Sequence, residues 1–587
     1  MSASLEILWR SFGSFPGFLL MFFRSSLGRF LALLICCALA AGCKTRLGQA
    51  LAYRGPNVSP RIALADEPDD REMEKTAQAH AHYAAGVIAE MNQQSEVALE
   101  EFYKAAINDP SDEKLTIELS RKLLQSKQPE RAIELLTKSS ERPKASASIF
   151  AQLGLAYAQA GKTDQAISAN RGAIKRDPRS LIGYQNLYVL YSQTGKHDNA
   201  YKVLEDASSR SDASGDFHLG VSEMWQNFSV QAPSRKDAAR AGALAALKRA
   251  DKAGGNNSSF RLRLADGYSA LGEDKRAAQL YLEVLKEMPD VPLLRERIHA
   301  KLTDIYLHDK DRKKATEQLQ AIVRDNPSNP QAYYFLGSIA FEDNRLPEAI
   351  DYYNKAIALN RNFEQAYYDL ALTQLSLNKN EDALSTLETA RKKFGENFIS
   401  EFWTGMAYSH QKDYKTALRY FTSAEIIARN SDPKRLTREF YFQAGAAAER
   451  TGDFSLAEKH FEKCLELSPD FTEAQNYLGY MWAEHGQKLE KAKELIEKAV
   501  KAEPKNAAYL DSLAWVYFKM DRPKEGLGYM LKAVEFSAEP DATLFDHLGD
   551  IYAAMKEQEK AREAWQKSLS IESNEAVRKK LAPDSAK

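Results

Sequence analysis

The chain has few of the features that mark disulfide-stabilised proteins or nucleic-acid binders. It has only 4 cysteines in 587 residues, and three of them, Cys36, Cys37 and Cys43, lie within or directly after an N-terminal apolar run, which leaves one cysteine and no disulfide framework. Its 80 Lys and Arg residues nearly balance its 81 Asp and Glu residues, whereas a protein that binds nucleic acid more often has a strongly basic domain. We therefore expect no nucleic-acid partner.

Catalytic and metal-binding motifs are also missing. The triplet 161–163 (Gly-Lys-Thr) resembles the end of a phosphate-binding loop, but the glycine that such a loop needs five residues earlier is Ala156. His80 and His82 are two residues apart on a predicted helix, which splays them, and no set of acidic or cysteine ligands accompanies them. We expect no enzymatic activity, no metal and no cofactor.

The chain is instead rich in a periodic pattern of small and large residues. Alanines recur at steps of 34 residues, with three wider steps of 38 to 43, at Ala98, Ala132, Ala166, Ala200, Ala243, Ala277, Ala315, Ala349, Ala383, Ala417 and Ala457. Four residues after each alanine stands a large side chain, except at Asn170. Such a period predicts stacked helical hairpins, each of which buries its apolar face only against a neighbour.

The positions around each alanine resemble a known repeat family. The best copy combines a Leu-Gly pair, a tyrosine, two alanines and a closing proline, at Leu153, Gly154, Tyr157, Ala166, Ala173 and Pro178. In these offsets the chain resembles the tetratricopeptide repeat (TPR) family. The resemblance implies an all-α fold, a TPR α-solenoid in which about fourteen hairpins form a right-handed superhelix between Ala79 and Asn574.

Departures from the period divide the predicted solenoid. We expect one TPR array over residues 79–214, a second over residues 258–575 and a tail over residues 576–587. Residues 215–257, where the alanine step widens, form an irregular helical unit that is either a hinge or a pair of lengthened helices. A second widening near residues 430–435 is either loop-length variation or a functional insertion.

The N-terminus resembles a secretory signal. The apolar run Phe30–Ala41 is too short to span a bilayer and follows Arg24 and Arg29, as in a signal peptide. The rival interpretation joins residues 18–23 to this run as an uncleaved anchor, but the two arginines are costly in a bilayer. Met21 is an alternative start of translation.

A cysteine follows the apolar run directly. Cys43, after Ala-Ala-Gly, resembles the lipidated cysteine of a bacterial lipobox. The resemblance implies that residues 1–42 are removed as a signal peptide and that Cys43 carries acyl chains. Lys44 in place of aspartate favours the outer membrane in enterobacterial lipoproteins. Residues 43–78 are polar and lack sustained periodicity, which predicts a flexible tether.

One cysteine remains beyond that site. Cys464 stands where alanine stands in other repeats, seven residues after Ala457. A buried structural thiol and a reactive thiol are both open at this stage, and the small-residue position favours the first.

The resemblance also implies a concave groove lined by the first helix of each hairpin. Aromatic residues stand at groove positions, namely Tyr334, Phe341, Tyr368, Phe402, Phe442, Tyr480, Trp515 and Phe518. Exposed aromatics in a concavity are favoured binding anchors, although the same side chains could pack between helices. An extended peptide or a partner helix would suit such a groove.

The combined pattern predicts a function in binding. We expect a non-catalytic protein–protein interaction scaffold of the bacterial cell envelope, lipid-anchored through Cys43, in the outer membrane facing the periplasm. Its partners are other proteins or peptides. The alternative is a periplasmic assembly or carrier factor that shelters secreted chains, and an enzyme is the least favoured class.

Overall fold

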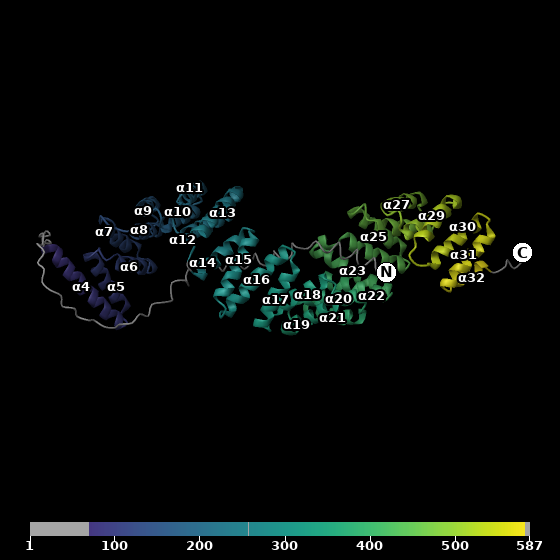
Figure 1. Ribbon diagram of the computed structural model, residues 1–587, viewed down its shortest axis with the longest axis horizontal. Helices are drawn as coiled ribbons and strands as arrows, with labels where there is room; N and C mark the ends of the chain where they lie inside the picture. The colour runs from purple at the N-terminus through teal and green to yellow at the C-terminus, as the bar shows by residue number, and fades with distance from the viewer. Residues whose placement is uncertain (1–69, 256, 582–587) are drawn as a thin grey trace. The chain divides into compact units, whose positions relative to one another are not determined.

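The fold is built from helices in two units. The computed structural model describes residues 70–255 and 257–581, and no β-strand occurs among them. Within this part of the chain, the boundary between the units lies between Asn326 and Pro327. In each unit, consecutive helices pair as antiparallel hairpins that stack side by side (Figure 1). The prediction of an all-α solenoid is confirmed.

The first unit consists of seven hairpins among its described residues. Its helices are α4 (Asp70–Met91), α5 (Ser95–Asn108), α6 (Glu113–Gln125), α7 (Pro129–Ser140), α8 (Ala147–Gln159), α9 (Thr163–Arg176), α10 (Leu181–Gln193), α11 (His197–Ser208), α12 (Gly215–Gln231), η1 (Pro233–Arg235), α13 (Lys236–Ala253), α14 (Ser258–Ala270), α15 (Asp274–Glu287), α16 (Pro292–His308) and α17 (Arg312–Asp325).

The second unit has seven further hairpins and a short terminal helix. Its helices are α18 (Pro330–Glu342), α19 (Leu346–Leu359), α20 (Glu364–Ser376), α21 (Asn380–Phe394), α22 (Phe398–His410), α23 (Tyr414–Ser431), η2 (Pro433–Arg435), α24 (Arg438–Arg450), α25 (Phe454–Leu467), α26 (Thr472–Glu484), α27 (Leu489–Ala502), α28 (Ala507–Lys519), α29 (Pro523–Phe536), α30 (Ala542–Ala554), α31 (Gln558–Ile571) and α32 (Glu575–Leu581).

The small-and-large pattern packs the two helices of a hairpin together. Ala383 and Ala417 are fully buried, and the large residues four positions later, such as Phe421, are buried too. Phe421 lies against Gly405 on the paired helix, where an added Cβ would come within 2.7 Å of the ring. Close approach of the helix axes therefore requires a glycine facing the large ring.

Asn170 replaces the large apolar residue with a hydrogen-bonded one. It is buried, its Nδ2 donates to the carbonyl of Ala166 at 2.8 Å, and its Oδ1 accepts from Asn186 Nδ2 at 3.0 Å. Asn186 also donates to the carbonyl of Ala151 at 3.0 Å. The exception in the sequence pattern is thus a satisfied polar contact between neighbouring hairpins.

The wider steps between the recurring alanines correspond to longer helices. α12 has 17 residues and α13 has 18, where most repeat helices have 13 or 14. One hydrophobic core continues through this hairpin from Tyr184 to Ile305. The structure therefore favours lengthened helices over a hinge at residues 215–257. Near residues 430–435, α23 is similarly extended to 18 residues and is followed by η2.

Both ends of the solenoid differ from the predicted boundaries. α4 begins at Asp70, so the prediction of a tether is wrong for residues 70–78, which are rich in helix-favouring Glu, Ala, Met and Lys. The prediction of a tail is wrong for residues 576–581, because α32 is held there by Val577, which is buried against Trp565. The remaining residues 43–69 and 582–587 lie outside the described residues.

Candidate functional site: the inner helices of the second unit

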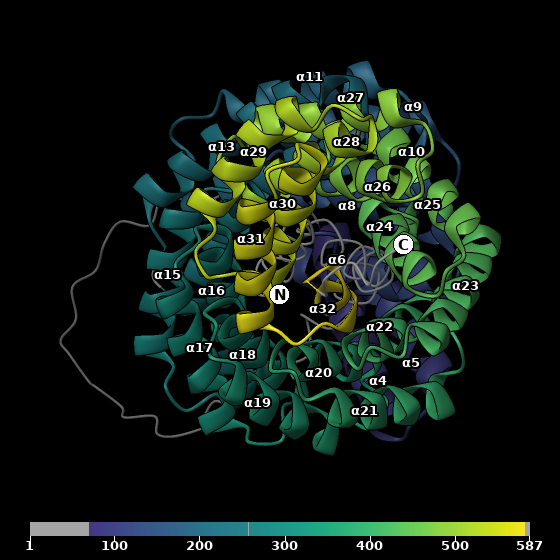
Figure 2. The ribbon, with the colours of Figure 1, turned by 90° about the vertical axis from the view of Figure 1, so that its right-hand side faces the viewer.

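The first helices of the hairpins in the second unit form one row. Along α18, α20, α22, α24, α26, α28 and α30, each helix contacts the next first helix as well as its own partner. Figure 2 shows α24, α26, α28 and α30 on the inner side of this unit and α23, α25, α27 and α29 on its outer side. All eight aromatic residues predicted to line a groove belong to this row.

Three of the predicted groove aromatics are core residues. Tyr368, Phe402 and Trp515 are only 2%, 3% and 6% exposed. The Phe402 ring packs against Phe421 of its own hairpin and Phe440 of the next, with centroid distances of 5.8 and 6.0 Å. Their assignment as exposed binding anchors is therefore wrong in this structure, because neighbouring helices cover them.

The other five predicted aromatics keep part of their surface in solvent. Tyr334, Phe341, Phe442, Tyr480 and Phe518 are half-buried. Tyr334 donates a hydrogen bond to Asp369 Oδ2 on the next inner helix at 2.7 Å, and desolvation raises the pKa of Asp369 to about 6. These five side chains can contribute apolar area to a partner while remaining anchored at one edge.

Around Trp515, three inner helices meet in a stack of rings. The Trp515 ring lies between Phe518, at 4.7 Å, and His547, at 3.9 Å, both nearly parallel to it. Its indole N–H donates to Glu484 Oε2 at 2.6 Å. Lys519 Nζ lies 4.9 Å from the Trp515 ring centroid. The stack therefore fixes α26, α28 and α30 against one another.

A buried polar pair supports this stack. Nδ1 of His547 is 2.8 Å from Asp511 Oδ1, and both residues are buried. Burial alone would lower the pKa of His547, but the charge of Asp511 and the hydrogen bond with it outweigh burial and raise the pKa. Asp511 thus stabilises the protonated form of His547, whose ring lies 3.9 Å from that of Trp515 between centroids.

The sequence pattern did not reveal Asp511, His547 or Tyr477. Tyr477 stands on α26 with Tyr480, is more than one-third exposed and contacts Phe442 at a centroid distance of 5.2 Å. Asp511 and His547 are 36 residues apart, close to one repeat length, and this spacing is the feature of the sequence that could have indicated their contact. We call Phe442, Tyr477, Tyr480 and Phe518 the aromatic platform, which the buried Trp515 supports by stacking on Phe518.

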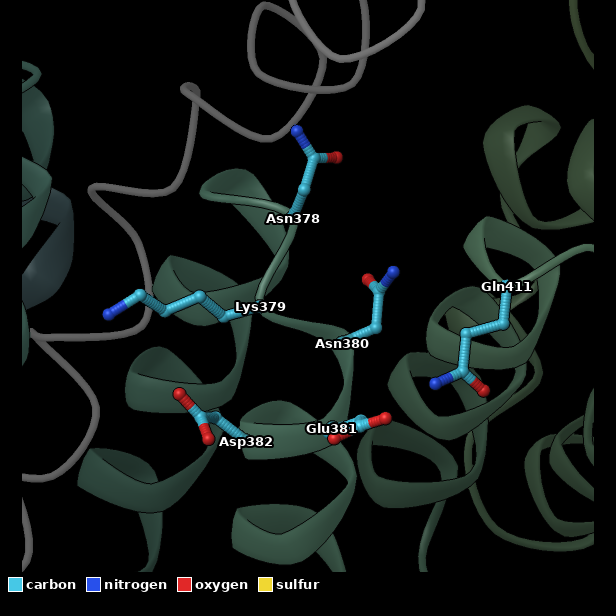
Figure 3. Close-up of a pocket in the computed structure, with 6 residues that line it drawn as sticks. All are labelled: Asn378, Lys379, Asn380, Glu381, Asp382 and Gln411. Carbon is cyan, nitrogen blue, oxygen red and sulfur yellow. The ribbon is translucent and has the colours of Figure 1, made fainter.

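A polar pocket of about 340 Å³ lies where the turns between α20 and α21 and between α22 and α23 come together. Figure 3 shows its lining, which consists of Asn378, Lys379, Asn380, Glu381, Asp382 and Gln411. The lining contains amides, carboxylates and an ammonium group, with no cysteine, serine or histidine among its residues. It offers no nucleophile paired with a base.

One group in the described part of the chain has metal-ligand chemistry. Asp274, His308 and Asp309 place ligand atoms within 4.8 Å of one another, and His308 Nδ1 is 2.6 Å from Asp274 Oδ2. The group lies at the surface, in the turns of two neighbouring hairpins, and its histidine is already paired. We assign no ion to it.

Cys464 is a core residue of the second unit. It is fully buried, and burial raises the pKa of its thiol to about 12. At that pKa the reactive thiolate is scarcely populated at neutral pH. The thiol therefore packs as a small apolar side chain, as its position in the repeat predicts.

The predicted membrane attachment lies outside the described residues. This applies to the signal peptide at residues 1–42, the alternative start Met21 and the lipidation site Cys43. Among the helices that the structure describes, none is both long and apolar enough to cross a membrane.

Comparison with known families identifies the repeats. A model of the tetratricopeptide repeat matches residues 117–180, 306–365, 368–433 and 442–506, and two further models of this repeat match residues 402–470 and 542–575. Together these matches cover about half of the chain. The chain belongs to the tetratricopeptide repeat family.

Several curated proteins resemble parts of this chain. TPR repeat-containing protein PA4667 of Pseudomonas aeruginosa is 25% identical over 37% of this chain and 36% of its own length. Anaphase-promoting complex subunit 6 of Arabidopsis thaliana is 26% identical over 33% of this chain and 36% of its own length. Type IV pilus assembly protein PilF of P. aeruginosa is 27% identical over 24% of this chain and 55% of its own length. The chain thus spans about a third of the length of the first two relatives.

Two solved structures illustrate the similarity to known structures. The Cut9 and Hcn1 hetero-tetramer of the anaphase-promoting complex is 14% identical, covers 82% of this chain and 98% of that chain, and has a TM-score of 0.35. YrrB, described as a TPR protein with an unusual peptide-binding site, is 23% identical, covers 33% of this chain and 97% of its own, and has a TM-score of 0.28.

Proposed function

We propose that this TPR protein is a non-catalytic scaffold that binds protein partners on the inner helices of its second unit. Membership of the TPR family supports a role in protein–protein interaction. The aromatic platform supports placing the binding surface there, because its partly exposed rings on α24, α26 and α28 are fixed by ring contacts. Preorganised aromatic side chains bind with little loss of conformational entropy.

The proposed partner is an extended peptide or a helix with apolar anchors. Phe442, Tyr480 and Phe518 are half-buried on the successive inner helices α24, α26 and α28, which suits apolar side chains spaced along one segment. Glu484 and Lys519, which flank Trp515, lie 3.7 Å apart and add a pair of opposite charges at the rim. Polar groups at a rim give orientation more than affinity.

The test compares inner-face and outer-face variants. The double variant Tyr480→Ala, Phe518→Ala is expected to weaken binding of a captured partner at least tenfold, because both rings lose their contact area. The control Leu531→Ala removes an exposed apolar residue on the outer helix α29. Equal affinity for the double variant and the wild type would contradict the proposal.

The location of the scaffold is a separate part of the proposal. We propose that Cys43 carries acyl chains that hold the protein on the bacterial outer membrane, facing the periplasm, because two or more chains give durable anchoring. The partial likeness to a type IV pilus assembly protein of P. aeruginosa supports an envelope role. Cys43→Ser is expected to abolish labelled fatty-acid incorporation and to release the protein from membranes. Labelling that persists in this variant would contradict the lipidation.

The alternative is a carrier that shelters secreted chains on the same inner helices. A scaffold should capture one folded protein at fixed stoichiometry, whereas a carrier should bind many unfolded segments weakly. Native mass spectrometry of complexes isolated after in-cell crosslinking separates these two outcomes.

A further inference from the structure

The first and last hairpins of the described residues differ in how their outer sides are covered. At the C-terminal end, α32 lies over the last hairpin, where Val577 is buried against Ala561 and Trp565. Lys580 on the same helix contacts Asp546 at 2.8 Å and Asp550 at 2.6 Å. Terminal repeats need such a cover, because the outermost hairpin has no neighbour to bury its apolar side.

At the other end, α4 has a second apolar side that is exposed. One side of α4 packs on the rest of the first unit through buried residues such as Ala79 and Ala89. The opposite side carries a stripe at helical spacing that we call the N-terminal stripe, made of Met73, Ala77, Ala84, Ile88 and Met91. Its larger members, Met73, Ile88 and Met91, are 51%, 60% and 80% exposed.

Single apolar residues elsewhere, such as Val230 and Leu293, are equally exposed, but the first hairpin has several of them together. Tyr83 on α4 and Val97 on α5 are also exposed, so the first hairpin concentrates large apolar side chains at the surface. An exposed apolar patch on a soluble domain generally marks a surface that is covered by another group.

We propose that residues 44–65 of the same chain cover the N-terminal stripe. This segment precedes α4 by only a few residues and contains apolar side chains that could pack on the stripe, namely Leu47, Leu51, Tyr53, Val58, Ile62 and Leu64. In this account the first hairpin is capped from the N-terminal side, as α32 caps the last hairpin.

The charges of the two partners are complementary. Residues 44–65 contain four basic residues and no acidic one, the basic residues being Lys44, Arg46, Arg54 and Arg61. The first hairpin, residues 70–108, contains seven acidic and three basic residues. Attraction between a net charge of +4 and one of −4 favours their association and would weaken at high salt.

The length of the segment is sufficient. The stripe from Met73 to Met91 extends about 27 Å along the helix at about 1.5 Å per residue. Residues 44–65 would cover about 70 Å if fully extended, at about 3.3 Å per residue. The short connection 66–69 holds the segment at an effective concentration on the order of millimolar, which favours it over a second copy of the chain.

The experiment places a photo-crosslinking residue at Ile88 in the full chain, in membranes and after detergent extraction. We expect an intrachain crosslink from position 88 to a peptide within residues 44–65, with a yield that does not depend on protein concentration. A matched probe at Val230, which is exposed on α12, should give no crosslink to that peptide. The double variant Arg54→Glu, Arg61→Glu should lower the yield at position 88 at least threefold.

Each other outcome overturns the proposal. A crosslink between two chains would assign the stripe to a second copy, and an adduct with lipid would assign it to the membrane surface. No adduct at position 88, or a yield unchanged by the charge reversal and by 0.5 M salt, would show that residues 44–65 do not cover the stripe.

Discussion

His547 and Asp511, on neighbouring inner helices of the second unit, form a buried pair with 2.8 Å between Nδ1 and Oδ1. The pair holds the imidazole against Trp515 and links two hairpins. Because stability in a repeat protein depends on contacts between adjacent repeats, this pair should make the end of the second unit sensitive to pH.

The first prediction concerns that pH dependence. The folded pKa of His547 is raised above its unfolded value of about 6.5, so the pair stabilises the fold fully below that pH and loses its contribution as pH rises through the folded pKa. Urea denaturation from pH 5 to 9 should show wild-type stability falling relative to His547→Gln across this window. A constant difference between the two proteins over the whole range would contradict the prediction.

The second prediction separates core from groove aromatics. Phe402→Ala should lower the free energy of unfolding by about 3–5 kcal/mol, the range for a buried Phe, because the ring is enclosed by three other phenylalanines. Phe341→Ala, at a half-buried position of the same row, is the matched control and should cost less. Equal losses in urea denaturation would show that the two sites are packed alike.

The third prediction tests the small-residue rule. Ala383→Leu should overpack the hairpin formed by α20 and α21 and cost about 1–3 kcal/mol, since Ala383 is fully buried. Glu388→Leu adds the same side chain at an exposed position of α21 and should leave stability within about 0.5 kcal/mol. Thermal unfolding of both variants checks the difference, and an unaffected melting temperature for Ala383→Leu would refute it.

The fourth prediction concerns the polar exception at Asn170. A double-mutant cycle with Asn170→Ala and Asn186→Ala should give a coupling energy of about 0.5–1.5 kcal/mol, the usual net contribution of one hydrogen bond. Additive losses would mean that the 3.0 Å contact contributes nothing to the stacking of these hairpins.

Much of the fold could be predicted from the alanine period. Four first helices begin at Glu113, Ala147, Leu181 and Ser258, each nineteen residues before the recurring alanine of its repeat. The constant offset reflects the close packing that only a small residue permits at the alanine position. The widened steps were ambiguous, since an inserted residue can lengthen a helix or a loop equally well in sequence. Helix-favouring residues before Ala79 extended α4 beyond the repeat.

The candidate site could be predicted only in part. The period identifies the inner helices, but it does not say whether a ring at a predicted groove position points into the groove or against the next hairpin. Phe402 and Tyr368 lie against the next hairpin, whereas Tyr334 remains half-buried. The pairing of Asp511 with His547 depends on the offset between two hairpins, which no single repeat contains.

The central claim is that partners bind the inner helices of the second unit. Its most direct test is site-specific photo-crosslinking in intact cells, with the probe at Tyr480 on inner helix α26 or at Leu531 on outer helix α29. The account predicts a discrete protein adduct from position 480 that is lost in the Phe442→Ala, Phe518→Ala background, and none from position 531. An adduct from position 531 alone would contradict the account.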